Sequence, residues 1–192
     1  MVSIVSICNS ALLSLGAETI NNFDEGSTEA NACKAKWDIT LNSLLRSYPW
    51  NFATTRNVQT LPREDLPEGW EFSYQYPLPY DCIRVVKVYK DPTYKLEGRN
   101  ILSNCNECFI KYITNKKDIS EWDPLFVDLM ASRMTYELAY TLPRTGSMVD
   151  RSYKLYKTKW DEATSIDQSE DIPEDFGQFE SSLITSRQYG RY

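Results

Sequence analysis

Apolar residues recur at helical spacing in two segments near the start of the chain. In the first, positions 4, 7, 8, 11, 12 and 15 are apolar, and Gly16 supplies the left-handed conformation in which helices commonly end. The second begins after a polar turn, with Ser27 as its N-cap and Glu29 favourably placed in the first turn. It ends at Tyr48, because a residue before proline is driven out of the helical region. The pattern therefore predicts two helices before Pro49.

The hydrophobic period changes to two between Trp50 and about Lys117. Alternation is clearest over residues 70–76, 83–88 and 108–113, several of which carry apolar residues on both faces. Prolines fall between these runs or at their ends, as strand prolines must, at positions 62, 67, 77, 79 and 92. The pattern predicts a small antiparallel sheet or sandwich inserted between helices.

Helical spacing returns after residue 120. Ser120-x-x-Asp123 followed by Pro124 is a strong start signal, and the third helix, about 122 to 142, is apolar on most of its circumference. It is therefore expected to be the central, most buried helix. A fourth helix, about 147 to 167, has a narrower stripe: Val149, Tyr153, Tyr156, Trp160 and Ala163. Core packing is the ordinary explanation of both stripes.

These elements predict an α+β fold in three parts. Residues 1–49 and 119–167 form a four-helix bundle, and residues 50–118 form a β-rich domain inserted between its second and third helices. Residues 168–192 are polar and without periodicity, and their composition cannot bury a core of its own. They are expected to form an extended C-terminal arm bound to a partner, with the spaced aromatics Phe176, Phe179, Tyr189 and Tyr192 as anchors.

The net charge and the lengths of the apolar runs argue against nucleic acids and membranes as tightly bound partners. The net charge is -6 and the pI about 4.8, whereas a surface that grips phosphates needs a basic stripe. No apolar run approaches the roughly 20 residues that cross a bilayer, and the start of the chain lacks the basic region of a signal peptide. We expect synthesis in a cytosol, no membrane partner and no tight hold on DNA.

Candidate catalytic chemistry is scarce. The chain contains no histidine, which excludes Ser-His-Asp and Cys-His mechanisms, and its seven glycines are scattered singly, so that no phosphate-binding loop exists. Two carboxylates could still hydrolyse a glycoside, but among 27 Asp and Glu residues a chance pair is expected. Cys105 and Cys108 are the only two cysteines that lie near each other in the sequence. A structural zinc site needs four ligands, and this pair supplies two. We interpret that pair as a turn with incidental thiols, and expect no catalytic residues, metal or cofactor.

Three stretches carry a family resemblance. They are A-L-x-x-L-G with its D-E-G-S turn, P-W-N-F-A at the end of the second helix, and Y-x-L-P-x-D-C-I-R-V at the start of a central strand. Together with ISEWDPLFVDLMASRMTYELAYTL, they resemble the head-to-tail adaptors of tailed bacteriophages, known in short-tailed phages as tail tubular protein A. The resemblance covers roughly residues 7 to 165, and the arm has no motif that aligns.

The resemblance implies a structural virion protein at the head-to-tail junction. In that family the subunits form a twelve-membered ring that docks under the portal protein, extends the DNA channel and receives the tail nozzle protein, with tail fibres as a further neighbour. Double-stranded DNA would pass through without specific binding, as an acidic lining permits. Pro49, Trp50 and Phe52 would form the interdomain junction, packing the corner so that the helical and β-rich domains move as one body.

Two alternatives stay open. One is a carboxylate-dependent cell-wall or polysaccharide hydrolase of a phage tail, which needs two acids roughly 5 to 9.5 Å apart in an open cleft. The other is a host-directed interaction module, which would be a monomer. Measuring the mass of the protein in solution, alone and with portal protein, distinguishes both alternatives from the ring.

Overall fold

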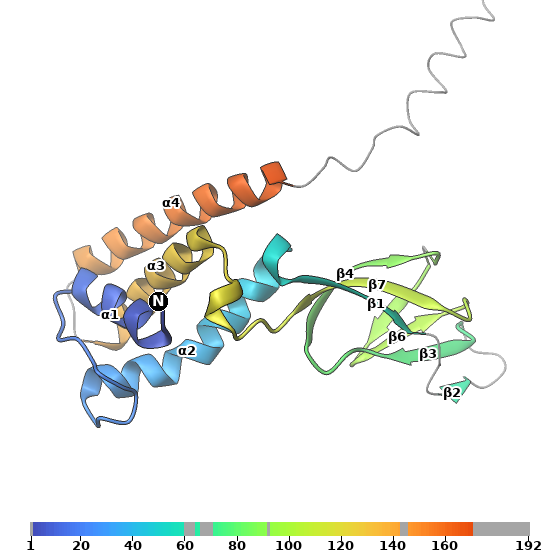
Figure 1. Cartoon of the computed structure of the whole chain (residues 1–192), viewed down its shortest axis with the longest axis horizontal. Coiled ribbons are helices and arrows are strands. Elements are labelled where there is room, and N and C mark those ends of the chain that lie inside the picture. The colour runs from blue at the N-terminus through green and yellow to red at the C-terminus, as the bar shows by residue number, and fades with distance from the viewer. Residues whose placement is uncertain (1, 60–63, 66–70, 92, 143–145, 171–192) are drawn as a thin grey trace, which may run out of the picture.

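The computed structural model describes residues 2–59, 64–65, 71–91, 93–142 and 146–170. They form a mixed α+β fold with four α-helices and two small antiparallel sheets. The helices are α1 (Ile4–Ser14), α2 (Thr28–Ser47), α3 (Pro124–Thr141) and α4 (Gly146–Glu170). All described strands lie between α2 and α3 in the sequence, and Figure 1 shows helices at one end of an elongated molecule and sheets at the other.

Most predicted helix ends are confirmed. Gly16 has a φ of +63°, Ser27 accepts a hydrogen bond from the N–H of Ala30, and Tyr48 is extended before Pro49. The start of α3 needs a correction. Asp123 is its N-cap, accepting from the Leu125 N–H at 2.7 Å, whereas Ser120 belongs to a separate 3-10 turn, Ile119–Glu121.

The fourth helix is longer than predicted. α4 continues to Glu170, so residues 168–170, expected in the arm, are helical instead. The Ser169 hydroxyl donates a hydrogen bond to the Ile166 carbonyl. This side-chain bond satisfies one of the main-chain carbonyls in the last turn of the helix. The predicted stripe is also less buried than expected: Ala163 is buried, but Tyr153 is 44% exposed.

Helix α3 is central, as its apolar circumference predicts. It packs against α1, α2 and α4. Its side chains at positions 126, 129, 130, 134 and 138 are fully shielded from solvent. Burying five large apolar side chains stabilises the fold by about 1.5 to 3 kcal/mol each, so α3 anchors the main core.

The strands form two sheets. One contains β1 (Thr54–Gln59), β7 (Cys108–Thr114) and β4 (Cys82–Tyr89), in the order β1-β7-β4. The other contains β2 (Glu64–Asp65), β3 (Tyr74–Pro77), β6 (Asn100–Ser103) and β5 (Lys95–Glu97), in the order β2-β3-β6-β5. A second core between them contains Tyr76, Ile101 and Ile110.

The strand predictions are confirmed in part. β4 and β7 match the predicted runs, but β4 is an edge strand with two register shifts and only Cys82 and Val88 buried, so it is not covered on both faces. The run 70–76 is shorter in the structure, because Phe72 lies before β3, and Trp70 lies outside the described residues. Pro77 ends β3 as predicted, while the prolines at 62, 67 and 92 lie outside the described residues.

Among the residues that the structure describes, no helix combines the length and the apolar character that crossing a bilayer requires.

Candidate functional site

The corner between α2 and β1 is the place where the predicted junction residues meet. Tyr48 adopts φ -139° and ψ 149°, which ends the helix, and a 3-10 turn, Asn51–Ala53, leads into β1. Trp50 is 1% exposed, whereas Pro49 and Phe52 are half-buried. The Thr54 hydroxyl closes the turn by bonding the Trp50 carbonyl at 2.8 Å. The chain thus turns from helix to strand around one buried indole.

Trp50 is the centre of an aromatic cluster. Its ring centroid lies 4.8 Å from that of Tyr48, 5.0 Å from Phe126 and 5.8 Å from Trp160, with Phe52 at 6.4 Å. The contacts with Phe126 and Trp160 are edge-to-face, the arrangement that the ring quadrupoles favour. Its indole N–H is satisfied by the Leu44 carbonyl at 2.9 Å. Residues of α2, α3 and α4 therefore converge on this one side chain.

The last turn of α4 is bonded to the same corner. The main-chain N–H of Asn51 donates to the Asp167 carboxylate at 3.1 Å, and the Asn51 side-chain amide donates to the Asp167 carbonyl at 2.7 Å. The Tyr48 hydroxyl also bonds the Thr164 carbonyl at 3.3 Å. The second bond of Asn51 satisfies one of the carbonyls that a helix end leaves without an intrahelical partner.

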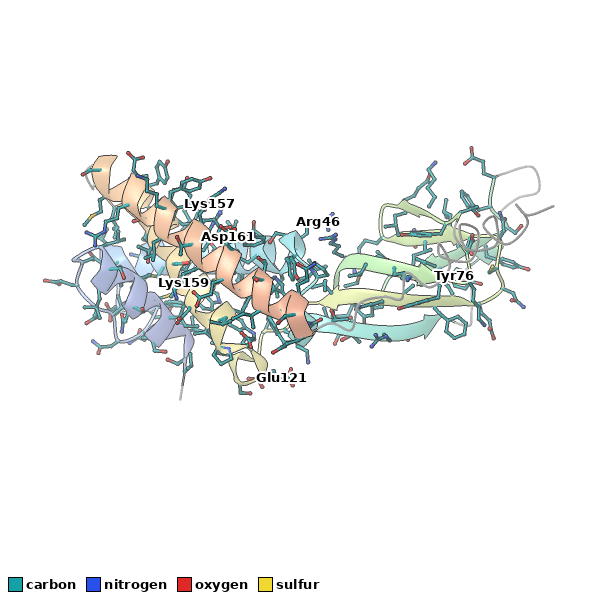
Figure 2. The ribbon with its side chains drawn as sticks, turned by 90° about the horizontal axis from the view of Figure 1, so that it is seen from above. Arg46, Tyr76, Glu121, Lys157, Lys159 and Asp161 are labelled. Carbon is teal, nitrogen blue, oxygen red and sulfur yellow. The ribbon has the colours of Figure 1, made fainter. Side chains whose placement is uncertain are left out.

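The returning chain, from β7 to α3, packs against the same core. Ile113 of β7 belongs to the helical core cluster and is fully buried. Trp122, in the connection, donates its indole N–H to the Lys116 carbonyl at 2.9 Å and stacks on Trp37 of α2 at 6.2 Å. Lys116 also forms an ion pair with Glu121, which is labelled below the helices in Figure 2.

Two arginines join α2 to β4 across the junction. Arg46, in the last turn of α2, donates to the Ile83 carbonyl at 2.7 Å. Arg84 donates in return to the Arg46 carbonyl at 3.1 Å. Both cations lie near the carbonyl end of α2, where the helix dipole favours positive charge. Figure 2 shows Arg46 between the helices and the sheets.

These arginines line an open surface pocket of about 610 Å³. Arg99, beside the β5–β6 turn, is the third cation in its wall and bonds the Pro79 carbonyl at 2.6 Å. Burial raises the pKa of Cys82, which also lines the pocket, while the positive charges of Arg99 and Arg46 act against that rise. The thiol is therefore uncharged at neutral pH, and the polar chemistry of the pocket is that of three guanidinium groups.

Sequence reasoning identified part of this site. The structure brings Pro49, Trp50 and Phe52 together at the corner. The sequence analysis did not identify Asn51, Asp167 or the pocket lined by the three arginines. Asp167 stood at the predicted end of the fourth helix, and polar residues at helix ends often bond main-chain groups, which is the only signal that pointed to it. The three arginines are 15 to 53 residues apart and have no common spacing.

The other predicted residues are placed as follows. The arm anchors Phe176, Phe179, Tyr189 and Tyr192 lie outside the described residues, so the arm stays a prediction. Cys105 lies in the bend between β6 and β7 and Cys108 begins β7, and both are free thiols. Burial raises the pKa of Cys108 to about 11.

Neither a metal-ion site nor a facing pair of carboxylates is found among the described residues. Within the described ranges, no three His, Cys, Asp or Glu side chains lie close enough together to hold a metal ion. Three further pockets open on the described surface; one is lined by Asp128, one by Glu107 and one by no carboxylate. Two acids thus do not face each other across any of these hollows.

No protein-family model matches the chain, and no curated protein matches it.

Proposed function

We propose that the chain is a head-to-tail adaptor of a short-tailed bacteriophage, a structural virion protein that forms a closed ring of about twelve subunits. The ring docks under the portal protein, extends the DNA channel and receives the tail nozzle protein. In this proposal α1–α4 act as a four-helix bundle domain, residues 50–118 act as a domain inserted into it, and the arm follows the end of α4 at Glu170.

The P-W-N-F-A segment carries the proposal. It is one of the three stretches that resemble the adaptor family, and each of its aromatics contacts residues of the helical core at the corner. An adaptor must transmit load between a partner above and a partner below, so its two ends need a stiff connection. Hydrogen bonds to α2 and α4, together with the ring contact between Trp50 and Phe126 of α3, supply such a connection.

The shape and charge of the subunit also support the proposal. The elongated arrangement in Figure 1 gives each subunit two ends for two different partners. Adjacent subunits of a closed ring meet through heterologous surfaces, and helices 30 Å or so in length form continuous walls. We therefore assign most subunit contact to the helices and direct the sheets towards the distal tail. The net charge of -6 suits a conduit through which DNA slides.

Particle mass is the test. The purified full chain is measured by mass photometry, alone and with portal protein, and any ring is imaged by cryo-electron microscopy. The expected result is a closed ring that binds portal protein, with the helices forming the subunit walls. A chain that stays monomeric in both conditions contradicts the proposal and favours the host-directed module. A virion map with the sheets against the portal contradicts the orientation alone.

A further inference from the structure

The arginine pocket is a positively charged hollow on an acidic protein. Its walls come from three separate parts of the chain: Arg46 on α2, Arg84 on β4 and Arg99 beside the β5–β6 turn. Between them lie apolar side chains, including Leu78, Ile83 and Leu96. Leu96 is 46% exposed although it belongs to a strand. The pocket thus combines cations with an open apolar surface.

Among the residues that the structure describes, the three guanidinium groups bond main-chain carbonyls and form no ion pair with a carboxylate. Arg46 bonds Ile83, Arg84 bonds the carbonyls of Arg46 and Ser47, and Arg99 bonds those of Pro79, Tyr80 and Cys82. Within the described part of the chain, the carboxylates that form ion pairs are bound by other cations. A guanidinium has five N–H donors, so each arginine keeps donors for an incoming group.

We propose that this pocket binds the acidic beginning of the arm, residues 170–176, of a neighbouring copy of the chain. The inference rests on the proposed function, from which it takes the ring and the arm, and it names the surface on which the arm docks. The segment reads Glu-Asp-Ile-Pro-Glu-Asp-Phe. It therefore offers four carboxylates, with Ile172, Pro173 and Phe176 between and after them.

The chemistry of the two surfaces is complementary. Arginine binds carboxylates through paired N–H donors, which gives both charge and geometry. The carboxylate pairs at 170–171 and 174–175 flank Ile172 and Pro173, which suits cations placed around Leu78, Ile83 and Leu96. The ring of Pro173 fixes one main-chain dihedral angle, which lowers the entropic cost of ordering this segment on binding.

The exit of the arm lies at the level of the pocket. Asp167 is bonded to Asn51, only five residues after Arg46, so α4 ends beside the junction and not at the far end of the helices. Figure 2 shows the end of α4 and Arg46 in the same region between helices and sheets. In a closed ring each subunit presents one arm and one pocket, and every arm can reach the next subunit by the same heterologous contact. Repeating that contact around the ring adds avidity.

Photo-crosslinking of the full chain identifies the occupant. Benzoylphenylalanine replaces Gln178, just beyond the acidic segment, and equal amounts of chain with natural nitrogen and with nitrogen-15 are mixed, assembled and irradiated. We expect crosslinks from position 178 to residues 78–85 or 96–99, with both isotopes in one crosslinked pair. Pairs of a single isotope place the arm in the pocket of its own chain and overturn the inference.

Charge reversal tests the energetics. Arg99→Glu and Glu174→Lys should each weaken subunit association about tenfold or more, and the two together should restore it. Glu174→Lys leaves every described contact intact, so its effect does not depend on the folding of the Arg99 variant. Lys154→Glu, an exposed position on α4, makes the same change of charge as Arg99→Glu and should leave association unchanged.

The outcomes separate this inference from the proposed function. A ring whose arms crosslink elsewhere, or whose assembly is indifferent to Glu174→Lys, overturns the inference and leaves the adaptor intact. Absence of any oligomer contradicts both. If Arg99→Glu instead lowers the affinity for a 30-base-pair duplex while Glu174→Lys assembles normally, the pocket takes nucleic acid and the inference is wrong.

Discussion

Asn51 donates two hydrogen bonds to Asp167, 116 residues further along the chain: its main-chain N–H to the carboxylate at 3.1 Å and its side-chain amide to the main-chain carbonyl at 2.7 Å. The first fixes the start of the 3-10 turn after Trp50, and the second closes the last turn of α4. The contact joins the chain at the corner, where it leaves α2, to the last turn of α4. It makes the corner and the end of α4 one structural unit.

Removing this contact should destabilise the corner. Asp167→Ala leaves the half-buried N–H of Asn51 without its acceptor, and we expect a loss of about 1 kcal/mol in the free energy of unfolding. Urea denaturation measures it. Asp167→Asn keeps an acceptor oxygen, so its free energy of unfolding should fall by less than that of Asp167→Ala. Equal stability of the alanine variant and the parent chain would show that the bond is compensated by water.

Truncating Trp50 should cost much more. The side chain is 1% exposed and contacts four other aromatic rings, so Trp50→Ala leaves a large cavity and should lower the free energy of unfolding by about 3 to 5 kcal/mol. Trp50→Phe fills most of the space but loses the hydrogen bond to the Leu44 carbonyl. Its free energy of unfolding should therefore lie between those of the parent chain and Trp50→Ala. Tyr80→Ala, at a position 96% exposed, is the control. A Trp50→Ala variant with an unchanged melting temperature would contradict the role of the corner.

Asp91 should make stability depend on pH in the acid range. Burial raises the pKa of this carboxyl, but hydrogen bonds from the Ser103 and Thr93 hydroxyls and from the N–H groups of Thr93 and Asn104 outweigh it and lower the pKa to about 2. A lowered pKa stabilises the fold above the ordinary value of 3.8. That contribution, about 2 kcal/mol, should disappear as the pH falls from 3.8 towards 2.

Denaturation at a series of pH values checks this expectation. Asp91→Asn should be less stable than the parent chain at pH 7, and the difference should shrink as the pH approaches 2. Asp150→Asn, at an exposed position on α4, is the control for the loss of one carboxylate. A constant difference across the range would mean that the Asp91 carboxylate is not held ionised by its hydrogen bonds.

Deleting the arm should separate folding from attachment. The buried cores lie within residues 7–163, so a chain ending at Glu170 should keep its melting temperature within about 2 °C. The same chain should no longer attach stably to portal-bearing heads, because the aromatic anchors are gone. Thermal unfolding followed by circular dichroism and co-sedimentation with heads give the two readouts. Normal docking and retention of packaged DNA by the shortened chain would refute the arm.

We predict that the chain does not hydrolyse peptidoglycan or polysaccharide, because none of the pockets described above is lined by two carboxylates. Purified protein is incubated with peptidoglycan and with capsular polysaccharide, and released reducing ends are measured against a buffer control. Hydrolysis that disappears on changing one specific Asp or Glu would establish the carboxylate-dependent enzyme in place of the adaptor.

The sequence by itself determined the helices and the buried side of the corner. Helical spacing, the Ser27 cap and Pro49 act over a few residues, so their consequences can be derived from local order alone. The apolar circumference of α3 predicted its central place, because a helix apolar all round must be covered. The resemblance that P-W-N-F-A carries, and not helical spacing, placed Trp50 at the packed corner, where the structure buries it.

Only the tertiary structure decided how distant polar groups pair. β1, with the sequence Thr-Thr-Arg-Asn-Val-Gln, carries almost no apolar signal and becomes a strand because β7 supplies its hydrogen-bond partners. Sheet pairing of this kind depends on the neighbour more than on intrinsic preference. Asn51 meets Asp167, and Arg46, Arg84 and Arg99 surround one pocket, only after helices and sheets have packed. Hydrophobic burial is encoded in periodic positions, whereas hydrogen bonds and charge clusters between distant segments depend on the geometry that burial produces.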